Sequence, residues 1–245
     1  MAALIRQHEP EGVTISVGGE IGEVGKYNTT VEELRAYVEG FNRTFGELSG
    51  GGTRGLSKIS VNTGSTHGGV VLPDGSIAKV KIDFDTLREM SNEARKLGMG
   101  GAVQHGASTL PSEAFNNFPK VGTAEVHLAT EFQNIMMDHP AFPEDLREEV
   151  RKFCFSELTG ERSADDTDEQ FVYKARKRAW GPFKQQVWNL DSSAKSKIFQ
   201  ALDEKFEFLY DQLGATNTRQ LVEQHIQPVK INKSKPESLE GAGTR

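Results

Sequence analysis

The chain has very little cysteine and no long apolar segment. Cys154 is the single cysteine among 245 residues, so an internal disulfide framework is excluded, and we interpret Cys154 as a small residue packed within a helix. No stretch approaches the ~20 apolar residues that a membrane-spanning helix needs. The first residues, MAALIRQHEPEG, show no long apolar run and no cleavage site, which predicts that no signal peptide is present. We expect a location in the reducing cytoplasm.

Basic residues are fewer than acidic residues in this chain. The net charge is −6 at pH 7 and the sequence pI is about 5.6. An acidic chain is repelled by phosphate backbones and by anionic lipid surfaces. We therefore expect neither nucleic acid nor a membrane as the main partner.

Glycine is spread unevenly along the chain. It is frequent up to about residue 125 and rare beyond about residue 140, where helical periodicity dominates. We interpret this change as a boundary and predict three regions. Residues 1–140 form an α/β region, residues 141–228 a helical extension, and residues 229–245 a polar tail without fixed structure.

Short apolar runs bounded by glycine are typical of strands buried on both faces, and the first region contains four of them. They occupy residues 13–17, 56–61, 101–104 and 124–128. Helix starts follow three of these runs: Thr30 and Glu33 form a capping box, Asp83 opens a helix that runs to about residue 97, and Pro111 opens a short one. Alternating strands and helices predict a parallel sheet with right-handed crossovers.

Two loops and three later helices complete the expected organisation. Pro73-Asp74-Gly75 predicts a β-hairpin over residues 70–80. The glycine-rich residues 49–53 form either a mobile loop over a site or a plain surface loop, and composition favours the surface loop. Amphipathic helices are expected over residues 143–158, 169–188 (interrupted near Gly181) and 193–213.

Three histidines follow apolar runs. They are His67, His105 and His127, and two of them directly precede a glycine. The carboxyl ends of parallel barrel strands form one face, so histidines drawn from different strands converge there, as a tetrahedral zinc site requires. A strand-end histidine is more often structural, and spacing alone leaves both interpretations open. Small residues after a ligand let backbone N–H groups approach an anion.

Five segments resemble motifs of the class II, zinc-dependent fructose-bisphosphate aldolases, and they occur in the family's order. Residues 65–68 resemble T-S-H-G, and residues 103–108 resemble L-H-G-G-S. Residues 19–22 are similar to E-L-G, residues 81–85 to L-D-F-D, and residues 125–131 to K-[VI]-N-I-x-T-[DE]. Any one motif is weak, but five in order are specific. Together they cover roughly residues 12–137.

The resemblance implies the C-terminal half of a (β/α)₈ barrel, about four βα units, followed by the helical extension. It implies a lyase of carbohydrate metabolism, acting in glycolysis, that cleaves fructose 1,6-bisphosphate reversibly into dihydroxyacetone phosphate and an aldehyde. His67 and His105 correspond to zinc ligands, and Glu20 matches a carboxylate at the metal site. Zn²⁺ would act there as a Lewis acid. The phosphate of the sugar substrate would be held by Gly68, Gly106, Ala107, Ser108, His127, Ala129 and Thr130.

Two departures from the family pattern affect the expected activity. The family's asparagine, which helps to hold substrate, is His127 here, so we expect a different specificity, toward another ketose phosphate, and an extra metal contact by His127 is an open alternative. The family's D-H-C-type segment, with its proton-transferring aspartate, has no match in this chain. The only Asp-His pair, Asp138-His139, precedes a proline and is a poor substitute.

The catalytic aspartate is therefore expected in the other half of the barrel, and we expect this chain to be inactive by itself. It would act as a homo-oligomer or together with the missing N-terminal half. Three alternatives remain open at this point. They are an aldolase for tagatose bisphosphate or another ketose phosphate, a non-catalytic subunit or scaffold with the family fold, and a phosphate-binding module without metal.

Overall fold

The computed structural model describes residues 1–22, 27–51, 55–64, 71–73, 78, 82–232 and 234. Its centre is a parallel sheet of four short strands in the order β1-β2-β3-β4. The strands are β1 (Gly18–Glu20), β2 (Lys58–Ser60), β3 (Ala102–Gln104) and β4 (Glu125–Val126). Consecutive strands lie side by side, with a helical or loop crossover between each pair, as in the βα units of a barrel. The expected fold class, half of a (β/α)₈ barrel with added helices, is confirmed.

The register sorts the strand residues onto two faces. Glu20 pairs with Ser60, Ser60 with Val103, and Val103 with Glu125. Because side chains alternate along a strand, Lys58 lies on this same face, two residues before Ser60. The opposite face carries Ile59 and Ala102, both fully buried. One face of the sheet is therefore largely polar, and the other enters the core.

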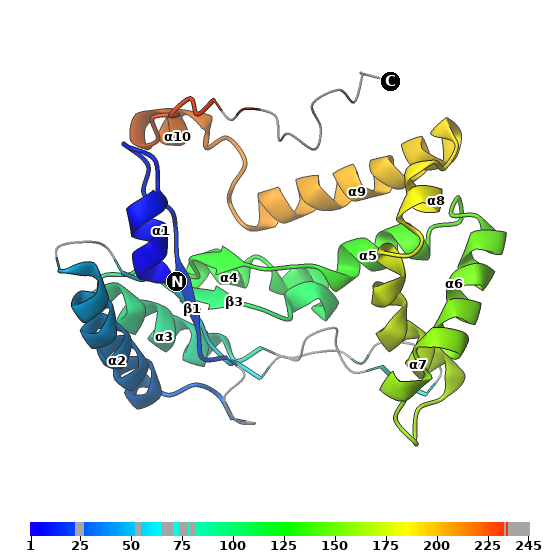
Figure 1. Ribbon diagram of the computed structural model, residues 1–245, viewed down its shortest axis with the longest axis horizontal. Helices are drawn as coiled ribbons and strands as arrows, with labels where there is room; N and C mark the ends of the chain where they lie inside the picture. Colours follow the sequence, from blue (N-terminus) through cyan, green and yellow to red (C-terminus); the bar gives the residue numbers. More distant parts are fainter. Residues whose placement is uncertain are drawn as a thin grey trace.

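Helices α2 (Val31–Ser49) and α3 (Phe84–Lys96) cover the apolar face and lie side by side in Figure 1. Leu34, Leu87 and Met90 contribute side chains that are at most 1% exposed to the shared core. The predicted capping box is present, because the Thr30 side chain accepts from Glu33 N while the Glu33 side chain accepts from Thr30 N. Asp83 caps α3 as expected. The helix ends before Gly98, at φ +85°.

The chain after β3 is built of short helical turns. They are η1 (Ala107–Thr109), η2 (Ser112–Ala114) and α4 (Asn117–Lys120), followed after β4 by α5 (Thr130–Met137). Phe115 and Phe118 from this stretch are at most 1% exposed, and their rings meet edge to face at 5.8 Å. They extend the core from the sheet toward the C-terminal helices.

The C-terminal region is helical, as its periodicity predicts. Its elements are α6 (Glu144–Glu157), η3 (Thr159–Glu161), α7 (Asp168–Ala175), η4 (Arg176–Trp180), α8 (Lys184–Trp188), α9 (Ser192–Gln212) and α10 (Arg219–His225). In Figure 1, α9 runs above α5, while α6 and α7 stand together at the right. Leu209 of α9 packs into the same core as the sheet. Lys205 also pairs with Glu131 of α5 at 2.6 Å, so α9 is anchored on the α/β region.

Two expectations about local structure need correction. The strand predicted over residues 13–17 is wrong, because the strand begins at Gly18, opposite Lys58. Before Gly18 the chain is joined to the neighbouring strand region only at Ser57, whose backbone N–H donates to Val17 O at 2.8 Å, while Ile15 N donates to the Glu9 side chain at 2.9 Å. Without a neighbouring backbone ladder, residues 13–17 cannot complete a strand. The sequence also did not predict α1 (Ala2–His8), where Arg6 reaches the carbonyl oxygens of Ile15 and Gly55.

The β-hairpin predicted over residues 70–80 and most of the predicted tail lie outside the described residues. The same holds for part of the glycine-rich loop over residues 49–53. Among the helices of the described part of the chain, none combines the length and apolar character that crossing a membrane requires.

Candidate active site at the carboxyl ends of the strands

Glu20, His105 and His127 converge at the carboxyl end of the sheet. Glu20 ends β1, His105 directly follows β3, and His127 directly follows β4. The Nδ1 atom of His105 lies 2.9 Å from Glu20 Oε1 and 3.3 Å from Ser60 Oγ. Side chains from three strands therefore surround one imidazole ring, because the ends of parallel strands meet at a common edge.

The two histidines contact each other. His105 Nε2 lies 2.8 Å from His127 Nδ1, and the ring centroids are 4.7 Å apart. His127 Nε2 lies 2.8 Å from Glu125 Oε2. Three contacts thus join Glu20, His105, His127 and Glu125 in one row, which we call the carboxylate–histidine row.

The hydrogen bonds of the carboxylate–histidine row can be compared with the protons that its two imidazole rings carry. Each of its three contacts needs one proton, whereas two neutral imidazoles carry two between them. Two neutral rings therefore leave one of the three contacts without a proton. A cation placed between the rings would satisfy the same two carboxylates.

Lys58 closes one end of the row. Its Nζ lies 2.7 Å from both carboxylate oxygens of Glu125, on the polar face of the sheet. Burial alone would raise the pKa of Glu125, but the hydrogen bonds from Lys58 and His127 offset this effect and hold the pKa below its usual value. Glu125 is therefore an ionised anchor for the His127 ring.

The second part of the site is a pair of adjacent loops. Gly106, at φ +69°, turns the chain after His105 and lets Ala107 become fully buried. Ser108 Oγ accepts a hydrogen bond from Ala129 N at 3.2 Å, which joins the loop after β3 to the loop after β4. Thr130 then begins α5, whose N-terminal end has no side-chain cap. Uncapped backbone N–H groups at a helix start are suited to an anion.

The structure brings together most of the site residues that the sequence predicts. Those that converge are Glu20, His105, Gly106, Ala107, Ser108, His127, Ala129 and Thr130. His67 and Gly68 lie outside the described residues.

Ser60, Lys58 and Glu125 were missed in the sequence. A signal was present, since Lys58 and Ser60, like Glu125 and His127, stand two residues apart and so share one face of a strand.

The Asp-His pair contributes nothing to this edge. The Asp138 carboxylate pairs with the Arg176 guanidinium, and His139 Nδ1 accepts from Ala141 N at 3.0 Å. The His139 side chain therefore stabilises the turn between α5 and α6, and the Asp138 side chain joins the end of α5 to η4 (Arg176–Trp180).

Comparison with known proteins points to a single family. The family model described as "Fructose-bisphosphate aldolase class-II" matches residues 8–210. No curated protein matches the chain. Solved structures do match it, and the chain spans only about half their length.

Two of these structures illustrate the similarity. A probable tagatose 6 phosphate kinase from Sinorhizobium meliloti 1021 is 18% identical over 85% of this chain and 57% of its own, with a TM-score of 0.50. A fructose-bisphosphate aldolase from Campylobacter jejuni is 17% identical over 83% of this chain and 53% of its own, with a TM-score of 0.40. The first likeness supports the fold, while the second is too distant to carry an argument.

Proposed function

Because the chain belongs to the class II fructose-bisphosphate aldolase family, we propose that it supplies the metal- and phosphate-binding part of an aldolase site. The reaction is the reversible cleavage of fructose 1,6-bisphosphate into dihydroxyacetone phosphate and an aldehyde. The observation that carries the proposal is the position of His105. The carboxylate–histidine row lies on one side of it, and the loops of Gly106, Ser108 and Ala129 follow directly on the other.

The residues present fit zinc in kind. Imidazole nitrogen and carboxylate oxygen are ligands that Zn²⁺ uses. Among the described residues, no group of three or more His, Cys, Asp or Glu side chains is arranged to hold an ion. The proposed set therefore includes His67, which lies outside those residues, together with His105. When bound, Zn²⁺ would supply Lewis-acid polarisation of the substrate carbonyl.

Glu20 fits an orienting role better than the direct ligand role expected from the sequence. Its Oε1 faces His105 Nδ1 at 2.9 Å, so a cation would have to bind the opposite nitrogen, Nε2, in place of the contact with His127 Nδ1 at 2.8 Å. Histidine ligands commonly donate their second N–H to a carboxylate, which fixes the tautomer and the direction of the ring. Ser60 Oγ, 3.3 Å from both Glu20 Oε1 and His105 Nδ1, supports the same orientation.

The phosphate of the substrate is assigned to the two joined loops. Backbone N–H groups near Gly106 and at the start of α5 would bind its oxygens, and the Ser108 hydroxyl stands beside them. His127 replaces the family's asparagine and is held by Glu125. A ring of this size in place of an amide favours a second candidate, cleavage of tagatose bisphosphate or another ketose phosphate.

Proton transfer at the aldehyde oxygen needs a further group. Retro-aldol cleavage requires an acid–base residue beside the reacting oxygen. Asp138 is occupied by Arg176 and stands at the turn between α5 and α6. We therefore assign this role to a residue that the other half of the barrel would supply. We expect no cleavage of fructose 1,6-bisphosphate by the isolated chain, even with added zinc, and activity when it is co-expressed with the N-terminal half of a related aldolase.

Zinc content tests the metal assignment. His105→Ala should lower the zinc measured by elemental analysis after dialysis. The matched control is His225→Ala, because His225 lies exposed on α10, away from the sheet. Glu20→Gln should weaken zinc affinity by roughly 10–100-fold without abolishing binding, as expected for an orienting partner. Equal zinc in wild type and His105→Ala would show the assignment to be wrong.

A further inference from the structure

Lys205 of α9 is turned into the molecule and meets an acidic residue of α5. Its Nζ lies 2.6 Å from Glu131 Oε1, and the Lys205 and Glu131 side chains are 14% and 24% exposed. The ammonium group also lies over the rings of Phe115 and Phe208, 5.4 and 4.9 Å from their centroids. Because Phe115 is fully buried, packing fixes the position of this ammonium group.

Glu131 lies in the first turn of α5, directly after Thr130. Acidic side chains in a first turn are attracted to the N–H groups of that turn. Among the described residues, however, no side chain caps the N-terminal end of α5, and the Glu131 carboxylate reaches Lys205 instead. Its second oxygen, Oε2, is buried and accepts no hydrogen bond from the described residues. The carboxylate is therefore directed toward α9 and not toward the end of its own helix.

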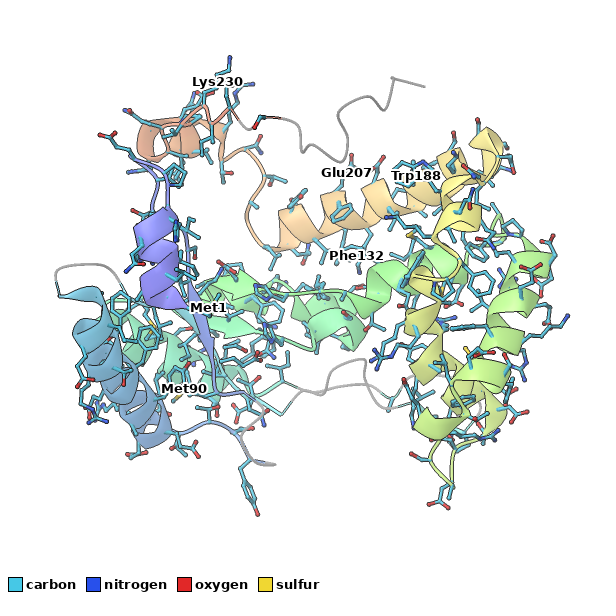
Figure 2. The ribbon with its side chains drawn as sticks, in the orientation of Figure 1. Met1, Met90, Phe132, Trp188, Glu207 and Lys230 are labelled. Atoms are coloured by element: carbon cyan, nitrogen blue, oxygen red, sulfur yellow. The ribbon has the colours of Figure 1, made fainter. Side chains whose placement is uncertain are left out.

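Helix α9 is also held on α5 by contacts other than this ion pair. The Phe132 and Phe206 rings stack with their centroids 4.7 Å apart, and Figure 2 shows Phe132 between the two helices. Leu209 packs into the core that the sheet shares. Replacing the charged group of Lys205 should therefore leave α9 in place, so its charge can be tested separately from the packing of the helix.

The direction of the Glu131 carboxylate bears on the proposed phosphate site. Inside α5, Gln133 N donates to Ala129 O at 3.3 Å, and the N–H groups before it have no acceptor within the helix. A carboxylate turned toward these donors would occupy them, and its charge would repel a phosphate bound at the same place. Lys205 prevents both effects, because it holds the carboxylate and compensates its charge.

We propose that Lys205 is a positioning residue of the phosphate site, which acts by holding Glu131 away from the N-terminal end of α5. The C-terminal helical extension thereby contributes to substrate binding without touching the substrate. This inference rests on the proposed function, because it concerns the same phosphate-binding loops. It adds a residue from α9 that lies 75 positions beyond Thr130 in the sequence.

The affinity of the full chain for inorganic phosphate, measured by isothermal titration calorimetry, tests the proposal. Lys205→Met keeps an apolar side chain of similar length but removes the charge. It should weaken phosphate binding roughly 5–30-fold, the factor that one uncompensated charge about 8 Å away gives at an effective dielectric constant of about 20–40. Lys197→Met is the matched control, because Lys197 is exposed on the same helix and loses the same charge about two turns away. Its affinity should stay close to that of wild type.

Substitution of Glu131 separates positioning from a merely structural role. Glu131→Gln removes the carboxylate and should bind phosphate at least as tightly as wild type. The double variant Lys205→Met/Glu131→Gln should recover near wild-type affinity, because no uncompensated charge remains. A pair that served solely to anchor α9 would give the opposite pattern, in which Glu131→Gln weakens phosphate binding and the double variant does not recover. Circular dichroism checks that each variant is folded.

Two results would overturn the proposal while leaving the phosphate site intact. One is wild-type phosphate affinity in Lys205→Met, and the other is a double variant that binds as weakly as Lys205→Met. If Lys205→Met does not fold, Glu131→Gln still decides, since weaker binding than wild type contradicts the proposal. A wild-type chain that binds no phosphate would remove the proposed phosphate site itself, and this inference with it.

Discussion

Gly106 lies at the point where the metal-binding and phosphate-binding parts of the proposed site meet, so its replacement tests both backbone strain and function. Its φ of +69° belongs to the left-handed region, where an L-residue costs about 1–2 kcal/mol. For a chain of this size each kcal/mol lowers Tm by about 2–4 °C. Gly106→Ala should therefore lower the Tm of the unliganded chain by about 2–8 °C. A β-branched valine should cost more.

Gly98 provides the control that separates strain from function. Its φ is +85° and a Cβ there would meet nothing within 4 Å, so Gly98→Ala carries a similar backbone cost far from the loops of the site. A ligand at 100 times its Kd stabilises the folded chain by about 2.7 kcal/mol. Fructose 1,6-bisphosphate at that excess should raise Tm by about 5–11 °C in wild type and in Gly98→Ala. Gly106→Ala should lose most of this protection.

Thermal unfolding with and without the sugar phosphate is the assay. Inorganic phosphate serves as a second probe, because the proposed contacts are to the phosphate itself. If Gly106→Ala and Gly98→Ala were protected equally, the glycine would serve the turn alone and the phosphate assignment would fail. If wild type showed no protection by either ligand, the two joined loops would not be an anion site.

Three further predictions concern stability and the row. Asp83→Ala removes the acceptor for Asp85 N and Thr86 N and should cost about 1 kcal/mol in chemical denaturation, whereas Asp83→Asn, an equally good cap, should cost less. The hydrogen bond from Thr86 N holds the pKa of Asp83 below its usual value. The stability that the cap contributes is therefore present above pH 3.8 and should be lost as pH falls through the folded pKa. A difference in unfolding free energy between wild type and Asp83→Ala that widens in acid would contradict the capping argument. Phe118→Ala empties a fully packed core position and should cost about 3–5 kcal/mol, against less than about 1 kcal/mol for Phe199→Ala on the surface. Glu125→Gln should leave His127 less well ordered, seen as broadened ¹⁵N signals of its ring by NMR, while an unchanged spectrum would exclude an anchoring role for Glu125.

Local features of the fold were predictable because local chemistry determines them. The Thr30 capping box, the Asp83 cap and the glycine stop at Gly98 act over three or four residues, and each was predicted where it is found. Three of the four strand runs contain the strands observed, since short β-branched runs between glycines leave few alternatives. The strand over residues 13–17 failed because strand formation depends on a neighbouring backbone that a local pattern does not reveal.

The residues at the carboxyl edge of the sheet were predictable, because strand order and parallel direction bring Glu20, His105 and His127 to one place. The contacts among these residues were not predictable and depend on the folded chain. The contacts of His105 with Glu20 and His127 span 85 and 22 residues, and the anchoring of Glu125 by Lys58 spans 67. Such contacts depend on register and side-chain direction, which a single strand pattern does not contain. Helix α9 behaves in the same way, since periodicity predicts an apolar face on it but only packing shows that Phe199 and Tyr210 on that helix remain exposed.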